Sequence, residues 1–124
     1  MTTDWPPEDL RRIDDAVELE IAVRRSDGSL ARRVPIWVVC AGGRVFVRTW
    51  HRRQTGWYGG ALRTRQARIR VPGLETEVVI DDLGYASAPV TAEVDAAYRR
   101  KYGPGAESMV TADATASTLE LIPY

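Results

Sequence analysis

Cationic and hydroxyl side chains follow one another where a predicted strand leads into a predicted helix. Arg48 and Thr49 end an alternating apolar segment, a loop with Arg52 and Arg53 follows, and a helix opens at Trp57. Guanidinium forks, hydroxyls and the free amides of a helix start all donate hydrogen bonds to anions such as phosphate. This order of residues indicates an anion site at the junction. The alternative is that the loop arginines solvate a surface segment, and the residues by themselves favour that alternative.

Aromatic side chains lie close to the same junction and offer a flat apolar wall. Trp37 stands in the middle of an apolar segment, and Trp50, Trp57 and Tyr58 flank the basic loop. Pockets that bind aromatic ligands are lined by such side chains. The same residues would equally serve as core or dimer-interface residues, as aromatics in strands commonly do. Both interpretations stay open from the residues alone.

Pro35 stands at the start of that apolar segment. Because proline has no N–H to donate to a sheet, it is found at strand edges, bulges and strand starts. We therefore expect the chain to bend at Pro35 and to leave a gap in the backbone pairing where a ligand can dock.

Metal and covalent chemistry have little support in the sequence. His51 is the only histidine and Cys40 the only cysteine, so no zinc site of Cys and His ligands can be assembled. Cys40 lies within an apolar strand, where a buried and inert thiol is expected. Gly42-Gly43 lacks the spacing and the lysine of a phosphate-binding loop. No catalytic residue is assigned, and Tyr58 and His51 are the nearest candidates for a proton donor.

The elements that would position these residues follow from the spacing of the apolar side chains. A short helix is predicted after Asp4 as its cap, with Leu10, Ile13 and Val17 on one face. Strands are predicted at 17–24, 30–41, 44–50, 67–71, 74–80 and 118–122, and further helices at 57–62 and 90–102.

The segment 30–41 is apolar on both faces from Pro35 onward, which is typical of a central strand covered on each side. Ser26-Asp27-Gly28 and Gly42-Gly43 predict tight turns before and after it. Short antiparallel strands with helices between hairpins predict a mainly β fold. We expect one domain over residues 1–124, a small barrel of about six strands and three helices.

Composition limits the partners and the compartment. The chain has 124 residues, of which 44% are hydrophobic, as expected for one soluble domain. Basic and acidic residues number 17 each, so no net field attracts nucleic acid or a membrane surface. The sequence shows no signal peptide, no membrane span and no cysteine pair, which predicts a cytoplasmic protein. Lys101 is the only lysine beside sixteen arginines, a bias typical of a GC-rich genome.

Over its whole length the sequence resembles the bacterial domain-of-unknown-function family 2255. The resemblance is carried by Trp5 with the acidic helix after it, Glu18-Leu19-Glu20-Ile21, Arg33-x-Pro35-Ile36-Trp37-Val38, Val47-Arg48, Gly56-Trp57-Tyr58, Asp95-Ala96-Ala97-Tyr98 with Lys101-Tyr102, and Thr118-Leu119-x-Leu121-x-Pro123. The family is similar to the FMN-binding split barrels, which include pyridoxamine-phosphate-oxidase-like enzymes and deazaflavin-dependent reductases.

The resemblance implies a split barrel that binds FMN or a deazaflavin and supports hydride transfer to a small organic substrate. The cofactor would carry the chemistry, and the protein would position the ring and exclude water. By this resemblance the wall beside the ring would be formed by Pro35, Ile36 and Trp37. The phosphate or tail would be contacted by Val47, Arg48, Thr49 and Arg52. The pocket would be closed by Trp57 and Tyr58. A homodimer is compatible with the resemblance, because related barrels place their ligand between subunits.

Two other functions stay open. One is a module that holds a flavin, a haem-like or another anionic aromatic ligand without turnover. The other is a barrel that has lost the site and interacts with proteins; Trp50 and Trp57 packed into the pocket would favour it. The helix start reads Trp57-Tyr58-Gly59-Gly60, where deazaflavin enzymes commonly have an asparagine.

Overall fold

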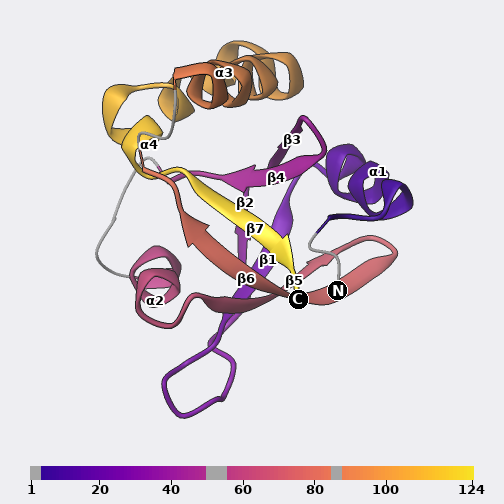
Figure 1. The fold of residues 1–124 in the computed structure, drawn as a ribbon, viewed down its shortest axis with the longest axis vertical. Helices are drawn as coiled ribbons and strands as arrows, with labels where there is room; N and C mark the ends of the chain where they lie inside the picture. The colour runs from indigo at the N-terminus through magenta and orange to yellow at the C-terminus, as the bar shows by residue number, and fades with distance from the viewer. Residues whose placement is uncertain (1–3, 50–55, 85–87) are drawn as a thin grey trace.

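A seven-stranded antiparallel sheet is the framework of the computed structural model, which describes residues 4–49, 56–84 and 88–124 (Figure 1). The strands are β1 Leu19–Val23, β2 Val34–Ile36, β3 Val39–Ala41, β4 Arg44–Val47, β5 Gln66–Val71, β6 Leu74–Asp82 and β7 Leu119–Pro123. Their order across the sheet is β2-β1-β5-β6-β7-β4-β3. The predicted mainly β split barrel is therefore confirmed.

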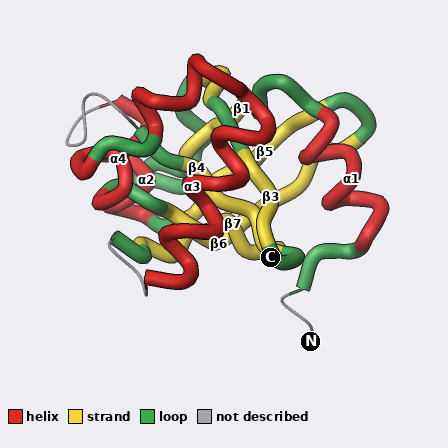
Figure 2. The backbone as a smooth tube through the Cα atoms, turned by 90° about the horizontal axis from the view of Figure 1, so that it is seen from above, coloured by secondary structure: helices red, strands yellow, loops and turns green. Residues whose placement is uncertain are grey.

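Helices surround the sheet. They are α1 Pro7–Asp15, α2 Gly56–Thr64, α3 Ala88–Tyr102 and α4 Ala112–Ala116, with a 3-10 helix η1, Gly103–Met109, after α3. Seen from above, α3 lies across the strands, with α1 on one side and α2 on the other (Figure 2). Among the described residues, no helix combines the length and the apolar character that crossing a membrane requires.

Two residues, Trp37 and Val38, connect the opposite edges of this sheet. β2 pairs only with β1 at one edge, and β3 pairs only with β4 at the other. Three peptide units separate Ile36 from Val39, so their Cα atoms lie within about 11 Å of each other. The sheet must therefore curl until its edges meet, and this closes the barrel.

The prediction of one central strand at 30–41 is wrong. The segment forms two three-residue edge strands, β2 and β3, that belong to opposite ends of the sheet, which also raises the strand count from six to seven. Ile36 and Val38 are buried in the barrel core, and Val39 is buried on the other face, in the core beneath α3. Pro35 lies opposite Glu20 in an edge strand, as its missing N–H requires. Strand pairing continues past Pro35 to Ile36 and is interrupted only at Trp37 and Val38.

The first helix also begins and ends differently from the prediction. It starts at Pro7 with Pro6 as its N-cap residue, so Asp4 is not the cap. It ends at Asp15, and Val17, which was expected on the apolar face, is 72% exposed in the connection to β1. Ile13 is fully buried as predicted. Proline at the first helical position supplied the stronger start signal, because its missing N–H needs no acceptor there.

Two apolar cores lie on the two faces of β4. Val45 and Val47 point into the barrel core, which contains most of the buried residues of β1, β5, β6 and β7. Phe46 points to the other face, into a second core with Val94 and Tyr98 of α3. The period of two along the strand produces this division. The same period places the side chain after Val47, that of Arg48, on the α3 side.

The last turn of α3 holds the connection between the sheet edges. The hydroxyl of Tyr102 donates to the carbonyl of Val17 at 2.6 Å and accepts from the N–H of Val38 at 3.1 Å. The ammonium of Lys101 donates to the carbonyl of Val38 at 2.8 Å and to that of Ile13 at 3.3 Å. Burial lowers the pKa of Lys101 and raises the pKa of Tyr102. One lysine and one tyrosine therefore satisfy the backbone where no strand partner can.

Replacing Tyr102 by phenylalanine tests this role. We expect Tyr102→Phe to lower the free energy of unfolding by about 1–3 kcal/mol, because the N–H of the buried Val38 loses its partner and the carbonyl of Val17 loses its donor. Urea unfolding followed by circular dichroism measures the change. Tyr124→Phe removes the same hydroxyl from a residue that is 79% exposed and should leave stability unchanged. Equal stability of both variants would contradict the assignment.

Candidate functional site

A cleft of about 480 Å³ opens beside the barrel closure. Six of the nine predicted cofactor contacts line it, namely Pro35, Ile36, Trp37, Arg48, Thr49 and Trp57. Glu18, Val34, Ser108 and Met109 complete the lining. The barrel closure brings these residues together, because β2, the end of β4, the start of α2 and the end of η1 all meet here. We call this space the Pro35 cleft.

Two predicted contacts, Val47 and Tyr58, are not among the described residues that line the cleft. Val47 is fully buried in the barrel core, and Tyr58 is 2% exposed in the same core. Arg52 lies outside the described residues, as do Trp50 and His51. Tyr58 therefore supports the fold beneath Trp57, whose ring it meets edge-on at a centroid distance of 5.6 Å.

Trp37 forms an aromatic wall of the Pro35 cleft. Its ring stacks on that of Tyr102, with centroids 4.0 Å apart and planes 3° from parallel. Both residues are half-buried. Tyr102 is held in turn by its bonds to Val17 and Val38. The orientation of the Trp37 ring is therefore set by the same α3 residue that secures the barrel closure.

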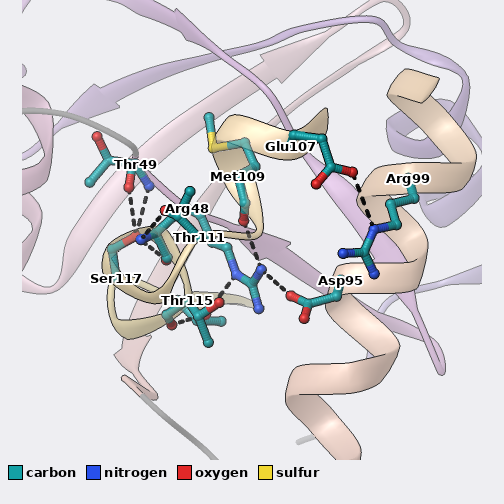
Figure 3. A network of polar contacts seen from close by, with 11 residues as sticks. Arg48, Thr49, Asp95, Arg99, Glu107, Met109, Thr111, Thr115 and Ser117 are labelled. Atoms are coloured by element: carbon teal, nitrogen blue, oxygen red, sulfur yellow. Dashed lines mark hydrogen bonds and ion pairs between the residues drawn. The ribbon is translucent and has the colours of Figure 1, made fainter. Parts of the chain in front are cut away.

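Arg48 is buried, with no exposure of its side chain, and protein acceptors surround it (Figure 3). Its Nε donates to Thr118 Oγ1 at 2.8 Å. Its Nη1 donates to Asp95 Oδ1 at 2.5 Å and to the carbonyl of Met109 at 2.8 Å. A phosphate contact from these two nitrogens would compete with acceptors already in place. Through Met109, Arg48 holds the end of η1 at the rim of the cleft.

Strand alternation places Arg48 on the α3 side of the sheet, where its surroundings suit a cation. Its guanidinium carbon lies 5.6 Å from the ring centroid of Tyr98, a cation–π distance. Among the described residues, its Nη2 and the Tyr98 hydroxyl have no hydrogen-bond partner. Burial raises the pKa of Tyr98, so the phenol stays neutral beside the cation.

Thr49 is fixed at the end of β4 by the segment before β7. Its N–H donates to Ser117 Oγ at 2.9 Å, and the hydroxyl of Ser117 donates to the carbonyl of Ala114 at 2.6 Å. Sequence reasoning missed Ser117 and also Asp95 as partners of this site. Asp95 and Thr118 stand in the motifs that carry the family resemblance, which was the available signal.

The described residues contain neither a metal cluster nor an activated thiol. No group of three His, Cys, Asp or Glu side chains among them could hold a metal ion. Burial, with Asp14 nearby, raises the pKa of the half-buried Cys40 to about 11. The prediction of an inert thiol agrees with this pKa, because the thiolate is the reactive form.

Comparisons with known proteins identify the fold class. The family model described as "Uncharacterized protein conserved in bacteria (DUF2255)" matches residues 9–121. None of the curated protein sequences matches the chain.

Three solved structures have a similar fold. HutZ, the haem storage protein from Vibrio cholerae, has a TM-score of 0.70 at 14% identity, with 100% of this chain and 92% of that chain covered. An "F420 reductase" has a TM-score of 0.56 at 15% identity, with 96% and 94% covered. A pyridoxamine 5'-phosphate oxidase-related, FMN-binding protein from Nostoc punctiforme has a TM-score of 0.53 at 13% identity, with 98% and 82% covered. At these identities the likeness shows the fold alone, and it confirms the predicted split barrel.

The ion pair between Arg48 and Asp95 should contribute strongly to stability. Asp95→Ala leaves a buried guanidinium without its counter-charge, and we expect a loss of about 3 kcal/mol in the free energy of unfolding. Urea unfolding measures it. Glu93→Ala, which removes an exposed carboxylate from the same helix, is the matched control and should stay within about 0.5 kcal/mol of the parent. Similar losses in the two variants would mean that the ion pair between Arg48 and Asp95 contributes no more to stability than the exposed carboxylate of Glu93 does.

The raised pKa of Cys40 predicts slow alkylation. At pH 8 the folded protein should react with iodoacetamide about a hundredfold more slowly than the same chain unfolded in urea, since the thiolate fraction falls tenfold per pKa unit. The folded rate should rise about tenfold per pH unit until the pH approaches 11, the pKa of the folded thiol. Mass spectrometry of quenched samples follows the reaction. Equal rates in both states would contradict the raised pKa.

Proposed function

This chain belongs to the bacterial DUF2255 family, and we propose that its Pro35 cleft binds the ring of FMN or a deazaflavin for hydride transfer to a small organic substrate. One observation supports the proposal: six of the nine residues that the family resemblance implies as cofactor contacts, from Pro35 to Trp57, line a single cleft. We also propose a homodimer, because related barrels place their ligand between subunits. A cytoplasmic location is proposed because the single cysteine, Cys40, allows no intrachain disulfide.

The cleft suits a flat apolar ring. Its volume of about 480 Å³ falls in the range of small-molecule pockets. Pro35 and Ile36 give an apolar wall, and Trp37 gives an aromatic one whose orientation is held by Tyr102. Stacked aromatic rings gain about 0.5–1.5 kcal/mol beyond the burial of their area.

The polar end of the cleft suits an anionic tail. Thr49 and the first turn of α2 at Trp57 lie there, and helix starts present free N–H groups to anions. Arg48 contributes to this end by holding Met109, because its Nε and Nη1 are already bonded to protein. Arg52 is a further tail contact by family resemblance.

A bound flavin or deazaflavin would supply the hydride chemistry. The residues of the chain would bind the ring, orient it and keep water from one of its faces. Tyr58 is buried in the core, so we do not assign it the proton donor that the sequence suggested.

Storage or sensing of an anionic aromatic ligand without turnover is the second candidate. It is favoured by the similarity of the fold to HutZ, whose name describes haem storage. The two candidates differ in turnover, because a storage protein would bind its ligand but would not exchange hydride with a substrate.

Titration of the purified protein with FMN, a deazaflavin and haem, followed by tryptophan fluorescence, tests the proposal. Trp37 and Trp57 line the cleft and should be quenched by a docked ring. We expect saturable quenching at micromolar concentration of FMN or the deazaflavin. Quenching by haem alone would support storage, and quenching by none of the three would reject both candidates.

A pair of tryptophan variants locates the ring. Trp37→Phe should weaken cofactor binding by about 1 kcal/mol, roughly fivefold in Kd, because a smaller ring stacks less well. Calorimetry measures the affinity. Trp5→Phe is the control, since Trp5 is buried away from the cleft with its Nε1 bonded to the carbonyl of Leu121 at 3.0 Å. Trp5→Phe should lower the stability of the protein without changing its affinity for the cofactor. Unchanged affinity in Trp37→Phe together with weaker binding in Trp5→Phe would show that the ring lies elsewhere.

A further inference from the structure

We propose that a second cleft, which adjoins the Pro35 cleft at Val34 and Trp57, binds a phosphoryl group. Four arginines among the described residues line it, Arg24, Arg25, Arg32 and Arg63, and its volume is about 480 Å³. None of the described residues that line it carries a carboxylate. We call it the arginine cleft. Its assignment does not rest on the proposed function of the Pro35 cleft.

Not every arginine side chain in the arginine cleft is paired with a carboxylate of the described chain. Arg24 forms an ion pair with Glu77 and donates to the carbonyl of Gly28. Arg25 donates to Ser29 Oγ and to the carbonyl of Leu30, which are neutral acceptors.

Arg32 and Arg63 are exposed, and their side chains form no ion pair or hydrogen bond with another described residue. The nearby carboxylate of Asp27 is not part of the lining; it accepts hydrogen bonds from Ser29, and these, with Arg25, lower its pKa. Two guanidinium groups therefore remain available to a ligand.

The scaffold of the arginine cleft is held in place by backbone bonds. The β1–β2 connection, residues 24–33, extends from the sheet on the side of α2 (Figure 1). The hydroxyl of Thr64 in α2 donates to the carbonyl of Arg24 at 2.7 Å, and the N–H of Arg24 donates to the carbonyl of Gln66 at 2.9 Å. A bridge between Arg24 and Leu30 closes the connection. The arginines thus project from a fixed hairpin and a fixed helix.

The start of α2 adds a second feature that favours phosphate. Gly56 and Trp57, in the first helical turn, line the arginine cleft together with the arginines. The N-terminus of a helix carries a partial positive charge and free N–H groups, and arginine forks match phosphate oxygens. The cleft continues to Thr64, about 12 Å along the helix, which leaves room for an organic group beside the phosphate.

The shared wall at Val34 and Trp57 allows two sources for the phosphoryl group. It belongs either to a molecule whose ring lies in the Pro35 cleft or to a separate phosphorylated small molecule. Both present the same chemistry to Arg32 and Arg63, so the site is first tested with inorganic pyrophosphate alone.

Calorimetric titration of the full chain with pyrophosphate tests the site. We expect saturable binding that weakens at high salt, and an affinity about tenfold or more lower in the double variant Arg32→Gln/Arg63→Gln. Arg11→Gln/Arg100→Gln is the control, because it removes the same charge from two exposed arginines beside Cys40. The single variants Arg32→Gln and Arg63→Gln keep the test decisive if the double variant does not fold.

Titrations with FMN and riboflavin separate the two sources. Weaker FMN binding but unchanged riboflavin binding in the double variant would place the phosphate of one ligand in the arginine cleft. Undiminished pyrophosphate binding to FMN-saturated protein would indicate a separate phosphorylated molecule. Pyrophosphate binding without FMN binding would reject the flavin proposal and leave the arginine cleft. No saturable pyrophosphate binding, or an equal loss in the control, would overturn the arginine cleft itself.

Discussion

A link of only two residues connects the two edges of the seven-stranded sheet. Trp37 and Val38 join β2 and β3, the two strands that have only one neighbour each. Because so short a link cannot span an open sheet of seven strands, the barrel must close. Closure leaves the polar backbone groups of the link without strand partners, and unpaired buried groups are costly. Lys101 and Tyr102 supply those partners.

Helix α3 joins the fold to the candidate site. Asp95, Tyr98 and Tyr102 are spaced three and four residues apart, so they lie on one face of the helix. The first two surround the buried Arg48, and the third secures the link and stacks on Trp37. Burying a guanidinium is expensive unless a carboxylate and further acceptors accompany it. One of these acceptors, the carbonyl of Met109, belongs to a residue that lines the Pro35 cleft, so this contact of Arg48 serves both stability and the geometry of the cleft.

Trp57 separates two spaces with different chemistry. On one side Pro35 and Trp37 give apolar and aromatic walls, in a cleft that also holds the polar residues Glu18 and Thr49. On the other side arginines project from the β1–β2 connection and α2, and two of them have no partner in the described chain. A flat ring and a phosphoryl group need these two environments, respectively. Both clefts open at the start of α2, so this short helix can contact an apolar ring on one side and an anionic group on the other.

Features that depend on neighbours along the chain could be predicted from the sequence. Alternation predicted β4 and placed Arg48 at its end, and the helical period predicted α3 with Tyr98 and Tyr102 as packing residues. Two features could not be predicted in this way: residues 34–41 divide between opposite sheet edges, and Asp95, 47 positions away, neutralises Arg48. The regular spacing of apolar residues indicates that a residue is buried, but it does not indicate which segment covers that residue. That choice is made when the barrel closes, because closure alone brings distant segments within contact distance.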